Sequence, residues 1–312
     1  MNGKAHAKIN ICLDVLGRRS DGYHEVNMIM QELSLCDDIE LVNAPAGSIF
    51  LEIDDRRSGH GNDYGNRENS DQSVNTSEGI QYVPTDMRNL MCRAAAAMIE
   101  HFNIKSGVAM KLTKRIPAAA GLGGGSSDAA AVIRLMNSLF GLNASAEELV
   151  NIGKSIGADV PYCIFGGTAI AAGIGEKLTP VESWLHTRVL LVKPQQGAST
   201  KEIYTAFDSI PAEEVLHPDI DTAVSMLGAA DLKGLCPAME NVLEPVTSAL
   251  LPEISEIEHY MEEHGAVKAM MSGSGPTVFG FFESEERMKA CAGKIRTECP
   301  AASFAEIICT GF

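Results

Sequence analysis

The feature that most constrains the fold is a glycine-rich segment between a strand pattern and a helix pattern. Residues 108–113 alternate apolar with polar side chains, which is typical of a half-buried strand. From Ala129 to Leu139 the apolar residues recur at helical spacing, and Gly141 ends that run. Between the two patterns the chain reads Ala-Ala-Ala-Gly-Leu-Gly-Gly-Gly-Ser-Ser-Asp. The order is therefore strand, glycine loop, helix.

This order favours a phosphate site at the glycine loop. Glycines let a backbone approach a ligand closely, and a serine-capped helix start offers N–H groups and positive dipole potential. The loop is not a Walker A sequence, because no Lys-Ser or Lys-Thr follows its last glycine, and it does not match G-x-G-x-x-G. The alternative is a flexible connector with a good helix cap. The flanking strand and helix favour phosphate over that alternative.

The rest of the chain also mixes strands with helices. Residues 5–16 alternate apolar with polar side chains, and residues 23–35 predict a second strand antiparallel to the first. Ser145 and Glu148 form a capping box for a helix over 146–156. Similar patterns predict strands around 49–53, 169, 188–192, 267–271 and 277–282, and helices over 89–102, 241–250 and 253–264.

One long stretch, residues 54–77, carries no element pattern. It is polar apart from Tyr64 and Val74. Such a stretch cannot bury enough apolar surface to offset its ordering entropy, so we expect a mobile loop. The functional alternative is a lid or a partner-binding segment, because long loops in compact domains are either functional or disordered.

Charge and composition exclude several classes of protein. The 312 residues hold 41 Asp and Glu against 25 Lys and Arg, and the net charge of -16 repels nucleic acids and anionic lipid surfaces. No apolar run approaches the ~18 residues of a membrane span, and residues 1–10 lack a secretory signal pattern. The cysteines form no C-x-x-C pair, and His259 and His264 lack zinc-motif spacing. We therefore expect a cytoplasmic protein that binds neither nucleic acid nor membrane.

Three polar residues become candidates for catalysis only when they are considered together with the phosphate loop. Asp159 lies in a Gly-Ala-Asp-Val-Pro sequence, where an aspartate taken alone is more often a turn former. Lys8 and Asn10 share the polar face of the first strand, where they would ordinarily be solvated. Phosphoryl transfer, however, needs a cation near the transferring group and a carboxylate that takes the acceptor's proton.

A series of motifs in one order carries a family resemblance. They are Ala7-Lys8-Ile9-Asn10 with Gly17 to His24, then Pro117 to Ala130, Gly157 to Pro161, and Ser272 to Thr277. Together they resemble the 4-diphosphocytidyl-2-C-methyl-D-erythritol kinases, a family in the superfamily of galactokinase, homoserine kinase, mevalonate kinase and phosphomevalonate kinase. The resemblance covers nearly the whole chain. The glycine loop alone is similar across the superfamily, whereas Ala-Lys-Ile-Asn followed by Asp-Gly-Tyr-His is specific to this family.

The resemblance implies an activity and its cofactors. The chain would transfer the ATP γ-phosphate to the 2-hydroxyl of 4-diphosphocytidyl-2-C-methyl-D-erythritol, in the non-mevalonate route to isoprenoid precursors, with ATP and Mg2+ as cofactors. Asp159 would be the general base, and Lys8 would hold Asp159 and stabilise developing charge. The implied partners are two small molecules, ATP and a cytidine diphosphate sugar-alcohol. The chain would be a monomer or a weak homodimer.

The resemblance also implies the binding residues. Tyr23 and His24 would recognise cytidine through an aromatic face and hydrogen bonds to the edge of the base, and Tyr204 would lie across the base. Asn10 would position the substrate. Gly273 belongs to a turn that would brace the phosphate loop and substrate, with an ordinary hairpin turn as the alternative. The nucleotide would be bound by Pro117, Ala118, Ala119, Ala120, Gly121, Leu122, Gly123, Gly124, Gly125, Ser126 and Ser127, with Asn89 and Lys114 nearby, and Ser126 or Ser127 would reach the magnesium ion.

The implied fold is the two-domain α+β fold of these kinases. An N-terminal two-layer α/β nucleotide-binding domain would span residues 1–165, and a ferredoxin-like domain residues 166–312. The stretch 54–77 is longer than the matching region of most relatives. Two other functions stay open. The first is a mevalonate or homoserine kinase, but the acceptor of such an enzyme contains no base that could stack on Tyr23 and His24. The second is a catalytically silent nucleotide-binding protein, which would be expected to lack Asp159 or Lys8.

Overall fold

The computed structural model describes residues 1–57, 82–303 and 305–312, and the chain forms two compact units. The first unit contains Met1–Ala5, Cys36–Ala119 and Gly124–Ile164. The second contains His6–Leu35, Ala120–Gly123 and Phe165–Phe312. The chain therefore passes between the units several times.

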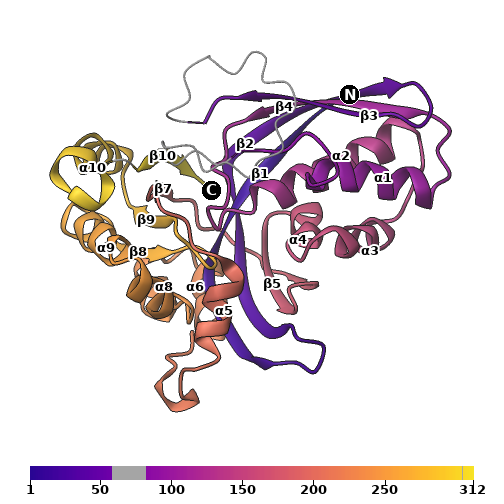
Figure 1. Ribbon diagram of the computed structural model, residues 1–312. Coiled ribbons are helices and arrows are strands. Elements are labelled where there is room, and N and C mark those ends of the chain that lie inside the picture. Colours follow the sequence, from indigo (N-terminus) through magenta and orange to yellow (C-terminus); the bar gives the residue numbers. More distant parts are fainter. Residues whose placement is uncertain (58–81, 304) are drawn as a thin grey trace. The chain divides into compact units, whose positions relative to one another are not determined.

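In the first unit, helices cover one face of a layer of strands (Figure 1). Strand β4 pairs in parallel with β3, where Ile53 is opposite Leu112, and antiparallel with the second half of β2, where Ile39 is opposite Leu112. The elements are β2 (His24–Ala44), β3 (Ile49–Asp55), α1 (Leu90–His101), β4 (Gly107–Lys114), α2 (Gly124–Leu139), α3 (Ala146–Ile156) and α4 (Val160–Phe165).

The apolar alternation in β4 decides which face of the strands is covered. Val108, Met110 and Leu112 are buried, whereas Lys111 between them is exposed. The serine half of the predicted capping box is confirmed, because Ser145 Oγ accepts a hydrogen bond from the backbone N–H of Glu148, the third residue of α3, while the Glu148 carboxylate pairs with His101. The predicted strand over 108–113 and the helix over 146–156 are thus both confirmed.

The second unit contains the first half of β2 and a separate four-stranded sheet. Strand β1 (Asn2–Arg18) pairs with β2, and residues 26–31 of β2 pair antiparallel with β5 (Thr168–Gly173), followed by β6 (Lys177–Pro180). The chain of β1 also reaches the C-terminal half: Leu13 and Asn241 form a parallel bridge, in which the N–H of Val242 donates to the carbonyl of Leu13 at 3.0 Å.

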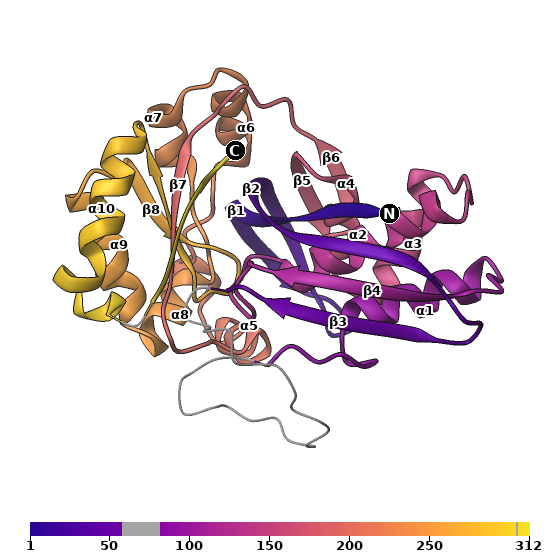
Figure 2. The same cartoon turned by 90° about the horizontal axis from the view of Figure 1, so that it is seen from above.

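The four-stranded sheet has the order β10-β7-β9-β8, with all neighbours antiparallel. Helices α9 and α10 lie on one side of these strands in Figure 2. A β-α-β-β-α-β chain order with this strand order is the ferredoxin-like arrangement, as predicted. The elements are β7 (Arg188–Lys193), α5 (Thr200–Phe207), α6 (Ile220–Gly228), α7 (Leu232–Leu235), α8 (Glu244–Leu250), α9 (Glu253–Glu263), β8 (Lys268–Met271), β9 (Val278–Phe282), α10 (Glu285–Glu298) and β10 (Glu306–Gly311).

Several strands extend further than the sequence pattern predicts, among them β1, which covers Asn2–Arg18 instead of 5–16. Strand β2 continues past Leu35 to Ala44, through Asp37, which is buried beside a lysine, and the buried Ile39 and Leu41. Strand β3 continues to Asp55, so the start of the polar stretch 54–77 is part of a strand. The remaining residues of that stretch, 58–77, lie outside the described residues, so the expected mobile loop stays a prediction.

Candidate active site

The phosphate loop follows β4 and leads into α2. Positive φ angles alternate along it, at Ala119, Gly121 and Gly123. Helix α2 begins at Gly124, five residues before the apolar helical pattern, because residues without apolar side chains add nothing to that pattern. Backbone N–H groups in the first turn of a helix have no acceptor within the helix. The turn from Gly124 to Ser127 can therefore present such donors to an anion.

A glycine is required at position 121 for both conformation and space. Its φ is +74°, and a Cβ there would lie 2.2 Å from the carbonyl oxygen of Ser272. The hydroxyl of Ser272 donates to the carbonyl of Gly121 at 3.0 Å. Within the second unit, the Ser-Gly-Ser-Gly-Pro turn and the middle of the phosphate loop are thus in direct contact.

Lys8 lies against the same part of the loop. Its backbone N–H donates to the carbonyl of Leu122 at 3.0 Å, and a Cβ on Gly123 would lie 2.9 Å from Lys8 Cγ. The residue is 4% exposed, and its ammonium donates to Asn10 Oδ1 at 2.8 Å. A buried lysine with a fixed side chain beside a glycine loop can supply a positive charge to a bound phosphate.

Asn10 links this lysine to the turn that contains Gly273. The amide nitrogen of Asn10 contacts Met28 Sδ at 3.3 Å, and a Cβ on Gly273 would lie 3.5 Å from Asn10 Oδ1. The turn itself is held by Asn241, whose amide donates to the carbonyls of Met271 and Gly273 at 2.9 and 2.8 Å. The second unit therefore brings Lys8, Asn10 and Gly273 together.

A second group of predicted residues in this unit contains aromatic rings. The rings of His24 and Tyr204 lie 4.8 Å apart with an interplanar angle of 38°. His24 Nε2 lies 2.6 Å from Asp208 Oδ1, and Asp208 ends helix α5 one turn after Tyr204. Tyr23 is 58% exposed. The geometry joins His24 to Tyr204 and leaves the Tyr23 ring accessible.

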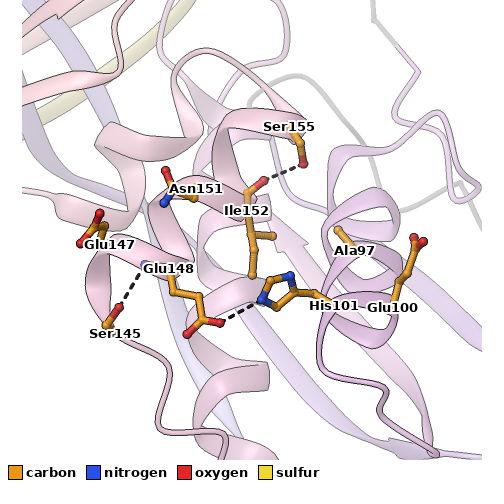
Figure 3. Close-up of a pocket in the computed structure, with 9 residues that line it drawn as sticks. All are labelled: Ala97, Glu100, His101, Ser145, Glu147, Glu148, Asn151, Ile152 and Ser155. Carbon is orange, nitrogen blue, oxygen red and sulfur yellow. Dashed lines mark hydrogen bonds and ion pairs between the residues drawn. The ribbon is translucent and has the colours of Figure 1, made fainter.

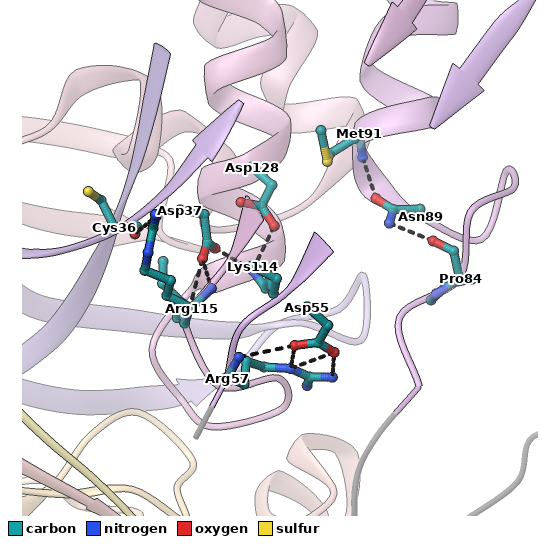
Figure 4. A network of polar contacts seen from close by, with 11 residues as sticks. Cys36, Asp37, Asp55, Arg57, Pro84, Asn89, Met91, Lys114, Arg115 and Asp128 are labelled. Carbon is teal, nitrogen blue, oxygen red and sulfur yellow. Dashed lines mark hydrogen bonds and ion pairs between the residues drawn. The ribbon is translucent and has the colours of Figure 1, made fainter. Parts of the chain in front are cut away.

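Lys114 is the buried centre of a charge cluster in the first unit (Figure 4). Its ammonium donates to Asp37 Oδ2 and to Asp128 Oδ2, at 2.5 and 2.7 Å. Burial favours a lower pKa for Lys114, but the two carboxylates outweigh burial and raise the pKa. Burial raises the pKa of Asp128 to about 7, although Lys114 opposes this shift. The Lys114 ammonium thus donates these hydrogen bonds to carboxylates inside the protein.

Asn89 acts as the N-cap of α1. Its side-chain oxygen accepts from the N–H of Met91 at 2.9 Å, and its amide donates to the carbonyl of Pro84 at 2.7 Å. Both ends of the side chain hold local backbone, which explains an asparagine at this position without a ligand.

Asp159 stands in the turn between α3 and α4 and is half-buried. Its carbonyl accepts from the N–H of Cys163, and the N–H of Val160 donates to Gly157, so the turn is fixed by backbone bonds. A Cβ on Gly157 would lie 3.9 Å from Ser126 Oγ. The first unit therefore brings the aspartate turn close to the start of α2, where Ser127 is buried and Ser126 is half-buried.

Several residues at these sites escape reasoning from the sequence. Asp37, Asp208 and Asn241 bind partners that are distant in the chain and lie in no motif, so no spacing indicates them. Asp128 closes the glycine motif and could have been singled out. Its Oδ1 is buried and has no hydrogen-bond partner.

A hollow elsewhere in the first unit lies between α1 and α3 (Figure 3). It has a volume of about 640 Å³, and His101 Nε2 pairs with Glu148 across it at 2.9 Å. It contains no predicted site residue. In the residues that the structure describes, no group of three or more metal-type side chains is found.

Comparisons with known proteins identify the family of this chain. The family described as GHMP kinases N terminal domain matches residues 89–167, and GHMP kinases C terminal matches residues 207–301. The 4-diphosphocytidyl-2-C-methyl-D-erythritol kinase of Clostridium beijerinckii is 43% identical over 95% of this chain and 96% of its own. The chain belongs to this kinase family. The corresponding protein of Geobacillus thermodenitrificans is 42% identical over 95% of this chain and 93% of its own.

Solved structures of this kinase family and of its superfamily share the fold. A crystal structure of 4-(cytidine 5'-diphospho)-2C-methyl-D-erythritol kinase has a TM-score of 0.75 and 28% identity, covering 100% of this chain and 98% of that one. A mevalonate kinase of L. major, in complex with R-mevalonate, has a TM-score of 0.72 and 17% identity, covering 100% of this chain and 95% of that one. The second likeness concerns the fold alone. The described residues contain no helix long and apolar enough to cross a membrane.

Proposed function

We propose that this chain transfers the γ-phosphoryl group of ATP to the 2-hydroxyl of 4-diphosphocytidyl-2-C-methyl-D-erythritol. The observation that carries the choice of acceptor is the ring pair of His24 and Tyr204, which a carboxylate holds in place. A cytidine base needs flat apolar contact and an edge-recognising group, whereas mevalonate and homoserine contain no base. The names and high coverage of the relatives support the same choice.

ATP binds, in this proposal, at the phosphate loop from Pro117 to Ser127. The alternating positive φ angles and the first turn of α2 turn backbone N–H groups toward an anion. Lys8 lies against Leu122 and Gly123 and adds a positive charge. Asn89 and Lys114 support the loop and the neighbouring helix through their own hydrogen bonds.

The residues also fit a magnesium ion that arrives with the nucleotide. Mg2+ takes oxygen ligands and usually binds one or two protein groups together with phosphates and water. The hydroxyls of Ser126 and Ser127 are oxygens of this kind, in the first turn of α2. When bound, the ion neutralises phosphate charge as the phosphoryl group transfers.

The chain's own residues then bind the acceptor and accept its proton. Asn10 and the turn at Gly273 position the substrate beside the loop, and the base lies with Tyr23, His24 and Tyr204. Asp159 accepts the proton of the 2-hydroxyl at its carboxylate, or orients the hydroxyl if the transition state is loose. Lys8 stabilises the charge that develops during the transfer.

Three general properties are part of the same proposal. The protein works in the cytoplasm and as a monomer or weak homodimer. The division into domains at residues 165 and 166 follows the family pattern.

The test is a coupled assay of ADP release with magnesium-ATP. It compares 4-diphosphocytidyl-2-C-methyl-D-erythritol with mevalonate and homoserine, for the wild type and for Asp159→Asn. We expect turnover with the cytidyl substrate alone and a loss of about 100-fold or more in kcat for the variant. Preference for mevalonate or homoserine would contradict the argument from His24 and Tyr204. A folded protein without any turnover would instead be a nucleotide-binding protein.

A further inference from the structure

The two ends of the phosphate loop are joined by one buried group of charges in the first unit (Figure 4). Lys114 is the last residue of β4, directly before the loop, and Asp128 lies in α2, directly after it. Their side chains are bonded to each other at 2.7 Å, and both residues are at most 3% exposed. Breaking a contact at this depth is costly, because removing one partner leaves the other charge buried and alone.

Asp37 on β2 completes the group. Its Oδ2 accepts from the Lys114 ammonium, and its Oδ1 accepts from the backbone N–H groups of Arg115 and Ile116. These two residues are the link between β4 and Pro117. One fully buried carboxylate thus holds both the lysine and the backbone that leads into the loop.

The lysine also reaches the first residue of α2. A Cβ on Gly124 would lie 3.1 Å from Lys114 Nζ and 3.0 Å from Ile116 Cγ2. The backbone of Lys114 is fixed in turn, since its carbonyl accepts from the N–H of Arg56 beside β3 at 2.8 Å. The start of the helix therefore lies directly on a group that cannot move independently of the sheet.

We propose that Asp37 and Asp128 are positioning residues, which act through Lys114 to hold the two ends of the phosphate loop at the separation that nucleotide binding needs. This rests on the function proposed above. Residues 117–123 are anchored at one end by Asp37 and at the other by Asp128, and the shared ammonium couples the two anchors. Loss of either carboxylate frees one end of the loop and weakens binding of ATP, while the contacts of His24 with Tyr204 and Asp208 are kept.

The main variant is Asp37→Asn, with Asp38→Asn as its matched control. Asparagine turns an amide toward the Lys114 ammonium, where a carboxylate oxygen stood. Asp38 is the next residue, is 45% exposed in its side chain and pairs with Arg115 Nη1 at 2.7 Å, so the control removes the same charge outside the buried group. Asp128→Asn tests the other anchor and serves if Asp37→Asn fails to fold.

Two measurements separate this inference from the proposed function. Hydrogen exchange of the amides of residues 115–124 in the ligand-free protein should be faster in Asp37→Asn and Asp128→Asn than in the wild type and Asp38→Asn. In the coupled assay, KM for ATP should rise about tenfold in the two buried variants, with KM for the cytidyl substrate within about twofold. A variant that is merely less stable would keep both KM values in its folded fraction.

The outcomes are distinct. Unchanged loop exchange in folded Asp37→Asn and Asp128→Asn would overturn the inference, whatever the enzyme does. Faster exchange with an unchanged KM for ATP would overturn the link to nucleotide binding. Faster exchange in a protein without kinase activity would support the structural anchor and count against the proposed function instead.

Discussion

His24 owes its hydrogen-bonding character to Asp208. A carboxylate only accepts hydrogen bonds, so His24 Nε2, which lies 2.6 Å from Asp208 Oδ1, is the donor in this contact, and the other ring nitrogen, Nδ1, faces away from this bond. In the proposed function, Asp208 would act on base recognition through His24, whose ring it holds.

Asp208→Asn should therefore affect the cytidyl substrate more than ATP. We expect KM for the cytidyl substrate to rise about tenfold and KM for ATP to stay within about twofold, because a charge-assisted hydrogen bond is replaced by a neutral one. Steady-state kinetics with each substrate varied in turn measures this. Glu202→Gln, which removes a charge from the exposed face of the same helix α5, is the control and should leave both KM values unchanged.

Glu258 gives the second unit a pH-dependent stability. Burial and then the neighbouring charge of Glu244 raise the pKa of Glu258 to about 9 from a usual value of 4.5. The folded state therefore keeps a proton that the unfolded chain loses. This contribution is complete below about pH 4.5, declines as the pH rises, and is lost above about pH 9.

Glu258→Gln should make the protein more stable than the wild type at pH 8. It should also reduce the loss of stability between pH 6 and pH 8.5, since glutamine has no proton to lose. Thermal melting followed by circular dichroism across that range measures the effect. Glu256→Gln, an exposed change on the same helix α9, should leave the decline as it is. A wild-type melting temperature that rises between pH 6 and pH 8.5 would contradict the prediction.

At the scale of elements, the glycines of the phosphate loop are not equivalent. Gly121→Ala introduces a Cβ at a φ of +74° and 2.2 Å from the Ser272 carbonyl, whereas Gly125→Ala meets only Leu90 Cδ1 at 3.7 Å. We expect the first change to lower the free energy of unfolding by about 2 kcal/mol. The second should leave it equal or slightly higher, since alanine favours a helix over glycine. Urea unfolding of both variants measures the difference, and equal losses would contradict the argument.

Several strands and helices could be predicted from the sequence where the pattern is local, whereas helices α5, α6, α7 and α10 and strands β6 and β10 were not predicted. Alternation in β4 and the serine cap of α3 are patterns within one element, and both are confirmed. The start of α2 was not predictable in this way, since Gly124 to Ser127 carry no apolar side chain. The continuation of β2 past Leu35 was also missed, because Asp37 reads as a loop residue until Lys114, 77 positions later, is known to pair with it.

In the candidate site, too, contacts between residues close in sequence could be predicted and contacts between distant residues could not. Lys8 and Asn10 stand two positions apart on a strand, so their contact follows from the pleat, and the bond between them is present. The bond between His24 and Asp208 spans 184 positions, which no local pattern encodes. The roles proposed for Asp159, Lys8 and the binding residues stay predictions.

At the scale of the whole molecule, the stability of the second unit depends on chain segments that are distant in sequence from its four-stranded sheet. A fragment of residues 166–312 contains all four strands of the ferredoxin-like sheet but lacks residues 6–35. Strand β5 then loses its partner β2, and residues 240–242 lose Leu13. We expect this fragment to melt at a lower temperature than a fusion in which residues 6–35 are joined to it by a flexible linker. Equal melting temperatures would contradict the prediction.

The bridge between Leu13 and Asn241 also sets an order of events in the cell. Residue 13 leaves the ribosome early, yet its partner is made 228 positions later. At typical synthesis rates of about 5–20 residues per second, this strand waits roughly ten to fifty seconds for its neighbour. During that interval β1 can already pair with β2, but Leu13 lacks its contacts with residues 240–242, so a nascent chain of this protein is a natural client for chaperones that shield incomplete sheets.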